Sequence, residues 1–469
     1  MNSINYQNAT NFQEKQELFS SNICDNQKNS VSATSVSGKQ VHITFDGDTI
    51  SSDAGALLLK EIEQQIGIID AIASVITDER DQRYVEHSLK QLLSQRIYQV
   101  ACNYEDANDC NSLRDDPIFK ICADKLPSTD SPLASQPTMS RFENSISMKT
   151  NYLIAKAFID KFIGSYSEEP NYIVIDFDDS DDTVHGNQEL SFFNNYFGEY
   201  CYMPLHVYEG ISGKLITAIL KPGKRLTGKG VMAILKRLIA HIRQSWKNTL
   251  IVFRGDSHFS SPEVMQLIKN QDNTFFVTGF TGYSTLDKFV ETTVNSAKKL
   301  YETKKQSVKL YHSFNYQASS WEEPQRIVAK IEYDEHGLNT RYIVTNLVKA
   351  RAKALYEEIY CKRGNMELFI KNHKTYLKSD RTSCHSFKAN QFRLFLHSAA
   401  YVLIHTLQTE VLKFTEFANV TMNTIQLKIL KIGAIVKELK TKINIVLPLS
   451  YPHQKIFCNS FEIFNSLRC

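Results

Sequence analysis

The chain has 469 residues, a length that favours several structural units over a single hydrophobic core. Its composition, 42% hydrophobic and 22% charged, is near the globular average and excludes collagen-like, purely coiled-coil and wholly disordered proteins. Because 54 basic residues nearly balance 51 acidic ones, the net charge of +3 neither favours nor excludes nucleic acid as a partner.

The nine cysteines are scattered without a Cys-x-x-Cys pair, which favours reduced thiols over a zinc site or a disulfide framework. No apolar run approaches the roughly 20 residues that a membrane-spanning helix needs. The N-terminus also lacks the basic-then-apolar order of a signal peptide. The sequence therefore predicts a cytoplasmic protein with no membrane partner.

The first part of the chain is predicted to change from a disordered tail to a helical region. Residues 1–38 are rich in Ser, Thr, Asn and Gln and keep no apolar period, so we expect a disordered polar tail. Residues 39–150 open with a short strand over Val41–Phe45 and then carry apolar residues at helical spacing over 54–75 and 85–100. We therefore expect residues 39–150 to form a mainly helical region.

Residues 151–281 are predicted to contain a mixed sheet. After a helix near 151–163 the apolar period changes to two. The pattern then predicts three strands, a helix, a strand, a helix and a further strand, with hairpin chemistry at Glu209–Gly213. This order indicates an α/β domain that opens with an antiparallel hairpin.

The remainder of the chain is predicted to return from strand to helix. Residues 282–346 have the pattern of an all-β insertion without a long helix. Helical spacing returns over 347–405 and continues in a helical C-terminal region, 406–469, where one helix is expected over 425–440.

Two predicted strands run directly into acidic residues. The strand Ile173–Ile175 continues into Asp176 and Asp178, which share one face because strand side chains alternate. Carboxylates on a core strand are costly unless a cation neutralises them, although a solvated acidic turn accounts for the same residues. A second apolar strand ends at Gly255 and Asp256, where an acid serves equally as a ligand or as a helix N-cap.

A third acid lies on a predicted helix. Offsets of 0, 3, 7 and 14 residues place Tyr360, Arg363, Glu367 and Lys374 within about a 60° sector of that helix. An acid, two bases and a phenol thus share one stripe, for which a salt-bridged exposed face is the structural alternative. Basic residues also cluster over 349–393, as phosphate neutralisation or an ordinary solvated helix would require.

The spacing Tyr-x₂-Arg-x₃-Glu-x₆-Lys resembles the signature of the DDE transposases of bacterial insertion sequences, in which the Glu is the third catalytic carboxylate. Arg254–Phe259 resembles the surroundings of the second acid, and Ile175–Ser180 with His185–Gln188 those of the first. Similar segments occur at 103–109, 113–117, 133–138 and 390–393, so the resemblance covers about residues 40–405.

The resemblance implies a ribonuclease H-like catalytic core interrupted by the β insertion. Residues 151–281 would form its first part and 347–405 its second part, while 39–150 would bind DNA. The implied partners are double-stranded DNA with terminal inverted repeats, target DNA, and a second copy of the chain in a homodimer on DNA. The implied location is the prokaryotic cytosol.

The resemblance also implies roles for individual residues. Asp256, Glu367 and one of Asp176 and Asp178, with Asp178 slightly favoured, would be the catalytic and metal-ligating acids. Two Mg²⁺ ions, with Mn²⁺ as a substitute, would promote DNA cleavage and strand transfer, because hard cations prefer oxygen ligands. The residues implied to contact DNA are Tyr360, Arg363, Lys374 and Arg254.

Two functional alternatives stay open: a catalytically silent, transposase-derived DNA-binding protein, and a metal-dependent nuclease of the same fold. The string Gly223–Gly230 nearly matches a phosphate-binding loop, but Gly230 stands where Ser or Thr would bind Mg²⁺, so we expect a basic turn that contacts DNA or solvent. Trp321, in the β insertion, is predicted either to stack on an extruded base or to belong to the core.

Overall fold

The computed structural model describes residues 30–467, and the chain divides after Thr49 into two compact units. In the first unit, β1 (Val31–Val36) and β2 (Lys39–Ile43) form an antiparallel hairpin. The turn uses Ser37 and Gly38, both with positive φ, as a tight hairpin between twisted strands requires. Residues 31–36, expected in the disordered tail, are thus a strand, whereas the rest of that predicted tail, 1–29, lies outside the described residues.

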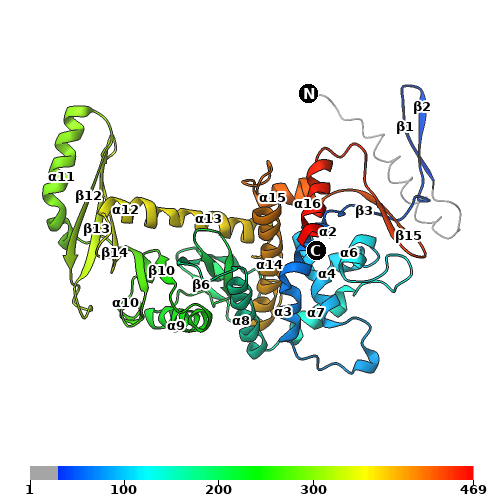
Figure 1. Cartoon of the computed structure of the whole chain (residues 1–469), viewed down its shortest axis with the longest axis horizontal. Coiled ribbons are helices and arrows are strands. Elements are labelled where there is room, and N and C mark those ends of the chain that lie inside the picture. The colour runs from blue at the N-terminus through cyan, green and yellow to red at the C-terminus, as the bar shows by residue number, and fades with distance from the viewer. Residues whose placement is uncertain (1–29, 468–469) are drawn as a thin grey trace, which may run out of the picture. The chain divides into compact units, whose positions relative to one another are not determined.

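The second unit contains an eight-stranded mixed sheet in the order β12-β13-β14-β11-β10-β4-β8-β9 (Figure 1). Its centre consists of β4 (Tyr172–Asp179), β8 (Leu205–Glu209), β9 (Leu215–Ile219), β10 (Leu250–Gly255) and β11 (Thr274–Phe280). β4, β8 and β9 are antiparallel neighbours, while β10 and β11 run parallel to β4. This is the ribonuclease H-like arrangement that the resemblance implied, and the mixed α/β class is confirmed.

The segment 282–346 extends this sheet instead of forming one of its own. The strands β12 (Val308–Tyr316), β13 (Gln325–Asp334) and β14 (Gly337–Thr345) are antiparallel, and β14 pairs with β11. The expectation of an all-β segment without a long helix is wrong, because α11 (Ser284–Lys304) packs along β12 and β13 (Figure 1). This helix buries only Leu286, Val290 and Ala297, a stripe too narrow to stand out against its polar residues.

The two faces of the central sheet are covered by different helices. α9 (Gly228–Ser245) and α10 (Pro262–Lys269) pack on the face that carries Ile175 and Phe253. The opposite face carries Val277 and lies against a continuous helical run, which buries Leu355 there. This run consists of α12 (Ala352–Ala354), η3 (Leu355–Tyr360), η4 (Cys361–Arg363), α13 (Gly364–Lys371) and η5 (Asn372–Tyr376).

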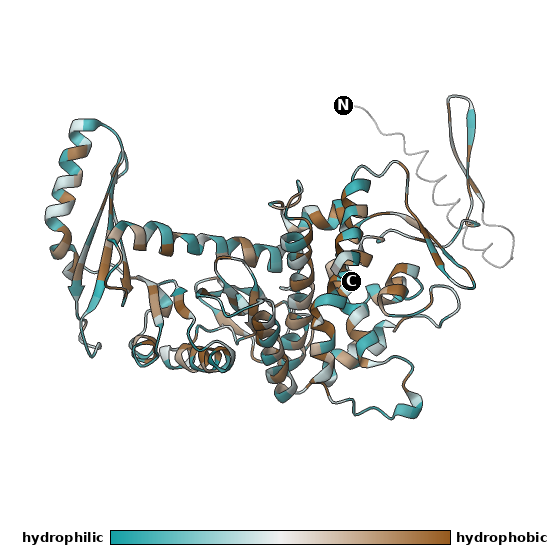
Figure 2. Cartoon of the chain, in the orientation of Figure 1, coloured by the Kyte–Doolittle hydropathy of each residue, from teal (hydrophilic) through white to brown (hydrophobic). Residues whose placement is uncertain are grey.

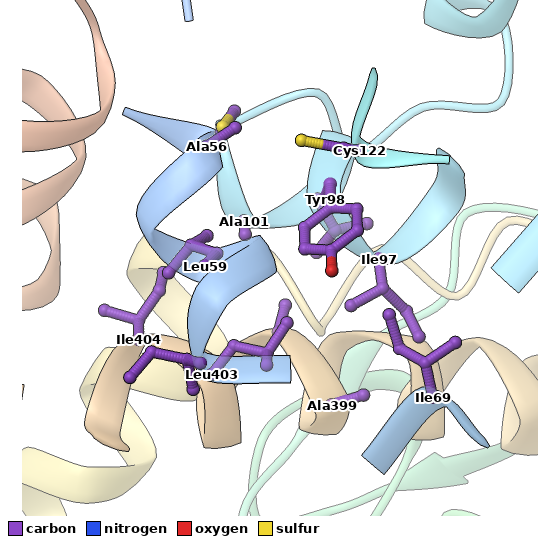
Figure 3. Packing of buried hydrophobic residues seen from close by; sticks show 14 of the residues in the cluster. Ala56, Leu59, Ile69, Ile97, Tyr98, Ala101, Cys122, Ala399, Leu403 and Ile404 are labelled. Atoms are coloured by element: carbon purple, nitrogen blue, oxygen red, sulfur yellow. The ribbon is translucent and has the colours of Figure 1, made fainter. Parts of the chain in front are cut away.

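A second core forms around α14 (Phe387–Thr406), in which every residue is at least partly buried. Figure 3 shows Ala399, Leu403 and Ile404 of this helix facing Leu59 and Ile97. The helices in this core are α2 (Ala56–Ile66), α3 (Ile68–Ser74), α4 (Leu89–Ala101), α6 (Pro117–Cys122), α7 (Gln136–Ser145) and α8 (Met148–Gly164). α5 (Asp109–Leu113) and η1 (Gln82–Tyr84) complete this region.

The helix expected over 425–440 ends early. After η6 (Leu407–Val411), α15 (Met422–Ile425) and η7 (Gln426–Leu430), the chain forms β15 (Ala434–Glu438). β15 pairs with β16 (Ile443–Val446) and with β3 (Ile50–Ser51), and α16 (Gln454–Leu467) follows. Gly433 and the β-branched Ile435 and Val436 explain the change from helix to strand.

Hydrophobic and hydrophilic residues alternate in bands along most helices (Figure 2), as amphipathic helices on a shared core require. None of the helices between residues 30 and 467 combines the length and the apolar character that a membrane span needs. The finer division of the chain into the six predicted parts stays a prediction.

Candidate active site

The carboxyl ends of β4 and β10 bring two acids together. The strands are parallel neighbours in a register that places Asp176 beside Arg254. Asp178 and Asp256 stand two residues further along their chains, and the backbone at Asp256 is still extended. Because side chains alternate along a strand, these two carboxylates share the face opposite Ile175 and Phe253.

The electrostatics of Asp178 reflect this arrangement. Burial raises the pKa of its carboxyl to about 6, and the charges of Asp256 and Asp179 act in the same direction, while Arg363 opposes them. Asp256 accepts a hydrogen bond from the backbone N–H of His258 at 2.9 Å. Neighbouring acids in a partly buried site favour a cation between them.

Asp176, the other candidate for the first acid, is fully buried and paired with Arg254. The guanidinium donates from Nε to Oδ1 at 2.6 Å and from Nη2 to Oδ2 at 2.5 Å. Burial raises the pKa of Asp176, and Arg254 opposes this shift. Both oxygens of Asp176 are thus engaged by Arg254, and the choice between Asp176 and Asp178 as the first acid stays a prediction.

Arg254, which was expected to contact DNA, lies in the interior of the structure. The side chain is 2% exposed, and its remaining donors reach the carbonyl oxygens of Ile359, at 2.5 Å from Nη1, and Gly210, at 3.3 Å from Nη2. A buried, fully hydrogen-bonded guanidinium offers nothing to a phosphate. Arg254 instead neutralises Asp176 and ties the helical run at Ile359 to the sheet.

Other acids at and after the end of β4 also have cationic partners. Nη2 of Arg363 lies 2.8 Å from Oδ1 of Asp178 in an ion pair, and Asp179 accepts a hydrogen bond from Nζ of Lys221 at 2.6 Å. Lys374 lies with its Nζ 3.1 Å from a carboxylate oxygen of Asp181.

Asp182 differs from these acids. It is buried, both of its oxygens lack a hydrogen-bond partner, and burial raises its pKa well above the usual range.

The signature residues lie along the helical run that crosses the strand ends. Tyr360 lies over β11, because a Cβ added to Gly279 would stand 2.7 Å from its hydroxyl oxygen. Arg363 and Lys374 face the acids of the β4 segment, and Glu367 lies between them in the chain with an exposed side chain.

The third acid does not complete a metal site in this conformation. Among residues 30–467, no group of three His, Cys, Asp or Glu side chains is arranged to hold a metal ion. Asp178 and Asp256 nevertheless fit a hard divalent cation, because they are neighbouring oxygen donors and the charge of Asp256 helps to raise the pKa of Asp178. Glu367 would have to approach them to complete the set.

Two residues near the acids were missed at the sequence level. Lys221 follows the apolar strand β9 and is 3% exposed, although an isolated lysine after a strand gives no signal of its partner. His258 lies in the same string as Asp256, and burial lowers its pKa, so its imidazole is neutral. Its Nε2 is buried without a hydrogen-bond partner.

The remaining sequence candidates have structural roles. Trp321 is 7% exposed and packs against Phe280 and Tyr316, with ring centroids 5.2 and 5.8 Å away. This ring belongs to the core beneath the sheet, which favours the core alternative over base stacking. In the glycine-rich string, Thr227 caps α9 by accepting from the Gly230 N–H, so the string is a strand-to-helix turn.

Comparisons with known proteins bear on the whole chain. Residues 33–469 match the family described as Transposase DDE domain group 1. A search of curated proteins gave no match. A similar solved structure is the cryo-EM structure of the piggyBac transposase synaptic complex with hairpin DNA, with 11% sequence identity and a TM-score of 0.41. The similarity covers 81% of this chain and 80% of that one.

Proposed function

We propose that this chain, which belongs to the family Transposase DDE domain group 1, cleaves DNA at the ends of an insertion element. It would then join the cleaved ends to target DNA. The proposal depends on the position of Asp178 and Asp256, which lie near each other at the carboxyl ends of adjacent parallel strands. Such strand ends are the usual position of functional groups in α/β sheets.

The acids would hold divalent cations. Asp178 and Asp256 would supply the first ligands and Glu367 the third, with Mg²⁺ as the cation and Mn²⁺ as a substitute. Bound in this way, the metal supplies a Lewis acid for both the attacking and the leaving oxygen of a phosphodiester. Asp178 must be ionised to ligate the metal. DNA cleavage by the protein should therefore decline as the pH falls below about 6.

The cations around the site would bind the DNA backbone. Arg363 is now paired with Asp178, and a metal that takes over this acid would leave Arg363 for a phosphate, while Lys374 would exchange its partner Asp181 for a phosphate directly. Tyr360, beside them on the same helical run, has a hydroxyl that donates hydrogen bonds to phosphate oxygens. Catalysis and DNA binding would then use the same set of charges.

The partners would be double-stranded DNA with terminal inverted repeats, recognised by the helical region 39–150, and target DNA. We expect a homodimer on DNA, because two element ends must be processed together, and a cytoplasmic location. These assignments follow from the family and from the position of the helices outside the sheet.

The test is incubation of the full chain with the DNA that flanks its own gene, in Mg²⁺, Mn²⁺ or EDTA. We expect metal-dependent nicks at the repeat ends and joined products with target DNA. Asp256→Asn should abolish both while retaining DNA binding, and the exposed control Asp272→Asn should retain all three.

Three results would contradict the proposal. Binding without cleavage in any metal would favour the silent DNA-binding protein. Cleavage without joined products would favour a nuclease. Cleavage that survives Asp256→Asn would refute the assigned site.

A further inference from the structure

A hairpin beside the active site exposes an unusual number of aromatic rings. β5 (Asp182–Thr183), β6 (Phe192–Asn194) and β7 (Glu199–Tyr202) form a small three-stranded sheet between β4 and β8. The exposed fractions of its aromatic residues are 37% for Phe192, 50% for Phe193, 80% for Tyr196 and 56% for Tyr200. Rings this exposed do not contribute fully to a core, so another function must account for them.

Two cations lie over these rings. Nζ of Lys224 is 4.9 Å from the ring centroid of Phe192, and the guanidinium carbon of Arg225 is 5.7 Å from that of Tyr196. These distances are typical of cation–π contacts. Both cations belong to the glycine-rich turn before α9, which the active site does not otherwise use.

Close packing holds this turn against the hairpin. Asn194 donates from Nδ2 to the carbonyl oxygen of Gly223 at 3.1 Å, and Tyr202 forms a β-bridge with Pro222. A Cβ on Gly223 would lie 2.3 Å from the backbone oxygen of Cys201, so only glycine fits there. Lys224 and Arg225 are thereby fixed over the exposed rings, and we call Phe192, Phe193, Tyr196, Tyr200, Lys224 and Arg225 the aromatic platform.

The aromatic platform is continuous with the acids. Lys221, three residues before Lys224, pairs with Asp179, the neighbour of Asp178. β5 also begins at Asp182, only three residues after Asp179. The platform therefore follows the acids closely in the chain and is tied to them through Lys221 and Asp179.

We propose that the aromatic platform binds an unpaired DNA strand next to the active site by stacking on its bases and pairing with its phosphates. This inference rests on the proposed function and takes over the base-stacking role that was expected of the buried Trp321. Single strands are bound by aromatic faces alternating with cations, since every base offers a π-face. Bases in a duplex are stacked on one another, so the platform should discriminate against paired DNA.

The test measures binding apart from catalysis, in EDTA. The probes are a labelled 20-nucleotide oligothymidine and a labelled 20-base-pair duplex, titrated with the full chain. Tyr196→Ala should weaken oligothymidine binding by about tenfold and leave duplex binding within about twofold, and Tyr196→Trp should restore the affinity. Because Tyr196 is 80% exposed, the fold should survive, which circular dichroism checks.

A matched control lies elsewhere in the chain. Phe414 is 91% exposed with Nζ of Lys413 at 5.2 Å from its ring centroid, so Phe414→Ala removes a similar cation–π pair outside the platform. It should change neither affinity. Unchanged oligothymidine binding in Tyr196→Ala, equal weakening on both probes, or an equal effect of Phe414→Ala would each overturn the inference.

The outcomes separate this inference from the proposed function. Asp256→Asn should lose cleavage of the flanking DNA yet bind oligothymidine like the wild type. If the wild type never cleaves but Tyr196→Ala still loses single-strand binding, the platform stands and the proposed function fails. If cleavage depends on Asp256 but the affinity for oligothymidine is the same in Tyr196→Ala as in the wild type, the role of the aromatic platform is refuted and the proposed function is supported.

Discussion

Replacing Asp178 by asparagine should stabilise the folded chain at neutral pH while abolishing metal-dependent activity. The carboxyl has an ordinary pKa of 3.8, which the folded environment raises to about 6. At about 1.4 kcal/mol per pH unit, this difference corresponds to about 3 kcal/mol. The attraction of Arg363 is already included, because the raised value results from all the surrounding charges and from burial.

The sign follows from linkage. A raised pKa means that the folded state favours the protonated acid, so ionisation costs stability as the pH rises from about 4 to about 6. Above that window the full cost is present, and asparagine, which cannot ionise, avoids it. The advantage of Asp178→Asn should thus be small at pH 4 and greatest at pH 7 and above.

Thermal unfolding in EDTA at pH 4, 5, 7 and 8 measures this advantage, with Asp115→Asn as the exposed control. The Tm difference between Asp178→Asn and wild type should grow with pH. Adding Mg²⁺ at pH 8 should raise the Tm of the wild type more than that of the variant, because a ligand stabilises the state that binds it. A Tm difference that is constant with pH, or negative at pH 8, would refute the reasoning.

Three further experiments, with four substitutions, test other parts of the structure. Arg254→Met leaves Asp176 buried without its partner and should cost about 3–5 kcal/mol of unfolding free energy; Asp176→Leu in the same chain should recover much of it, and no recovery would contradict the pairing. Gly279→Ala places a Cβ 2.9 Å from the backbone nitrogen of Ser257, next to Asp256. The variant should therefore lose most of its DNA cleavage activity while its Tm changes little. Glu143 bridges two buried arginines, which hold the pKa of its carboxyl below the usual value although burial acts to raise it. The wild type should therefore lose unfolding free energy as the pH falls from 5 to 3, and Glu143→Gln should not show this loss.

The acids could be found from the sequence, but their roles could not be separated there. Asp176 and Asp178 both follow an apolar run, and alternation puts them on one face. The two differ only because β10 lies beside β4 and brings Arg254 to Asp176. Strand neighbourhood is a tertiary property that period and composition do not contain.

The prediction of secondary structure was wrong where an element is only partly buried. The narrow apolar stripe of α11 was hidden among charged residues, although the spacing of Leu286, Val290 and Ala297 was present in the sequence. In β15 the pairing with β3, nearly 400 residues away in the chain, selects a strand in a region with helical neighbours. Glu367 illustrates another limit, because the signature places it on a stripe without fixing its distance from Asp178 and Asp256.

The pairing of Arg363 and Lys374 with carboxylates of the same chain has a thermodynamic consequence. A cation that must leave an acid to reach a phosphate adds little net positive charge, so without metal Arg363 and Lys374 should contribute little to the counterions released on DNA binding and to its salt dependence. Divalent cations on the acids would steepen that dependence and tighten binding. Reciprocity then requires DNA to raise the affinity for the metal by the same factor, so that each ligand recruits the other.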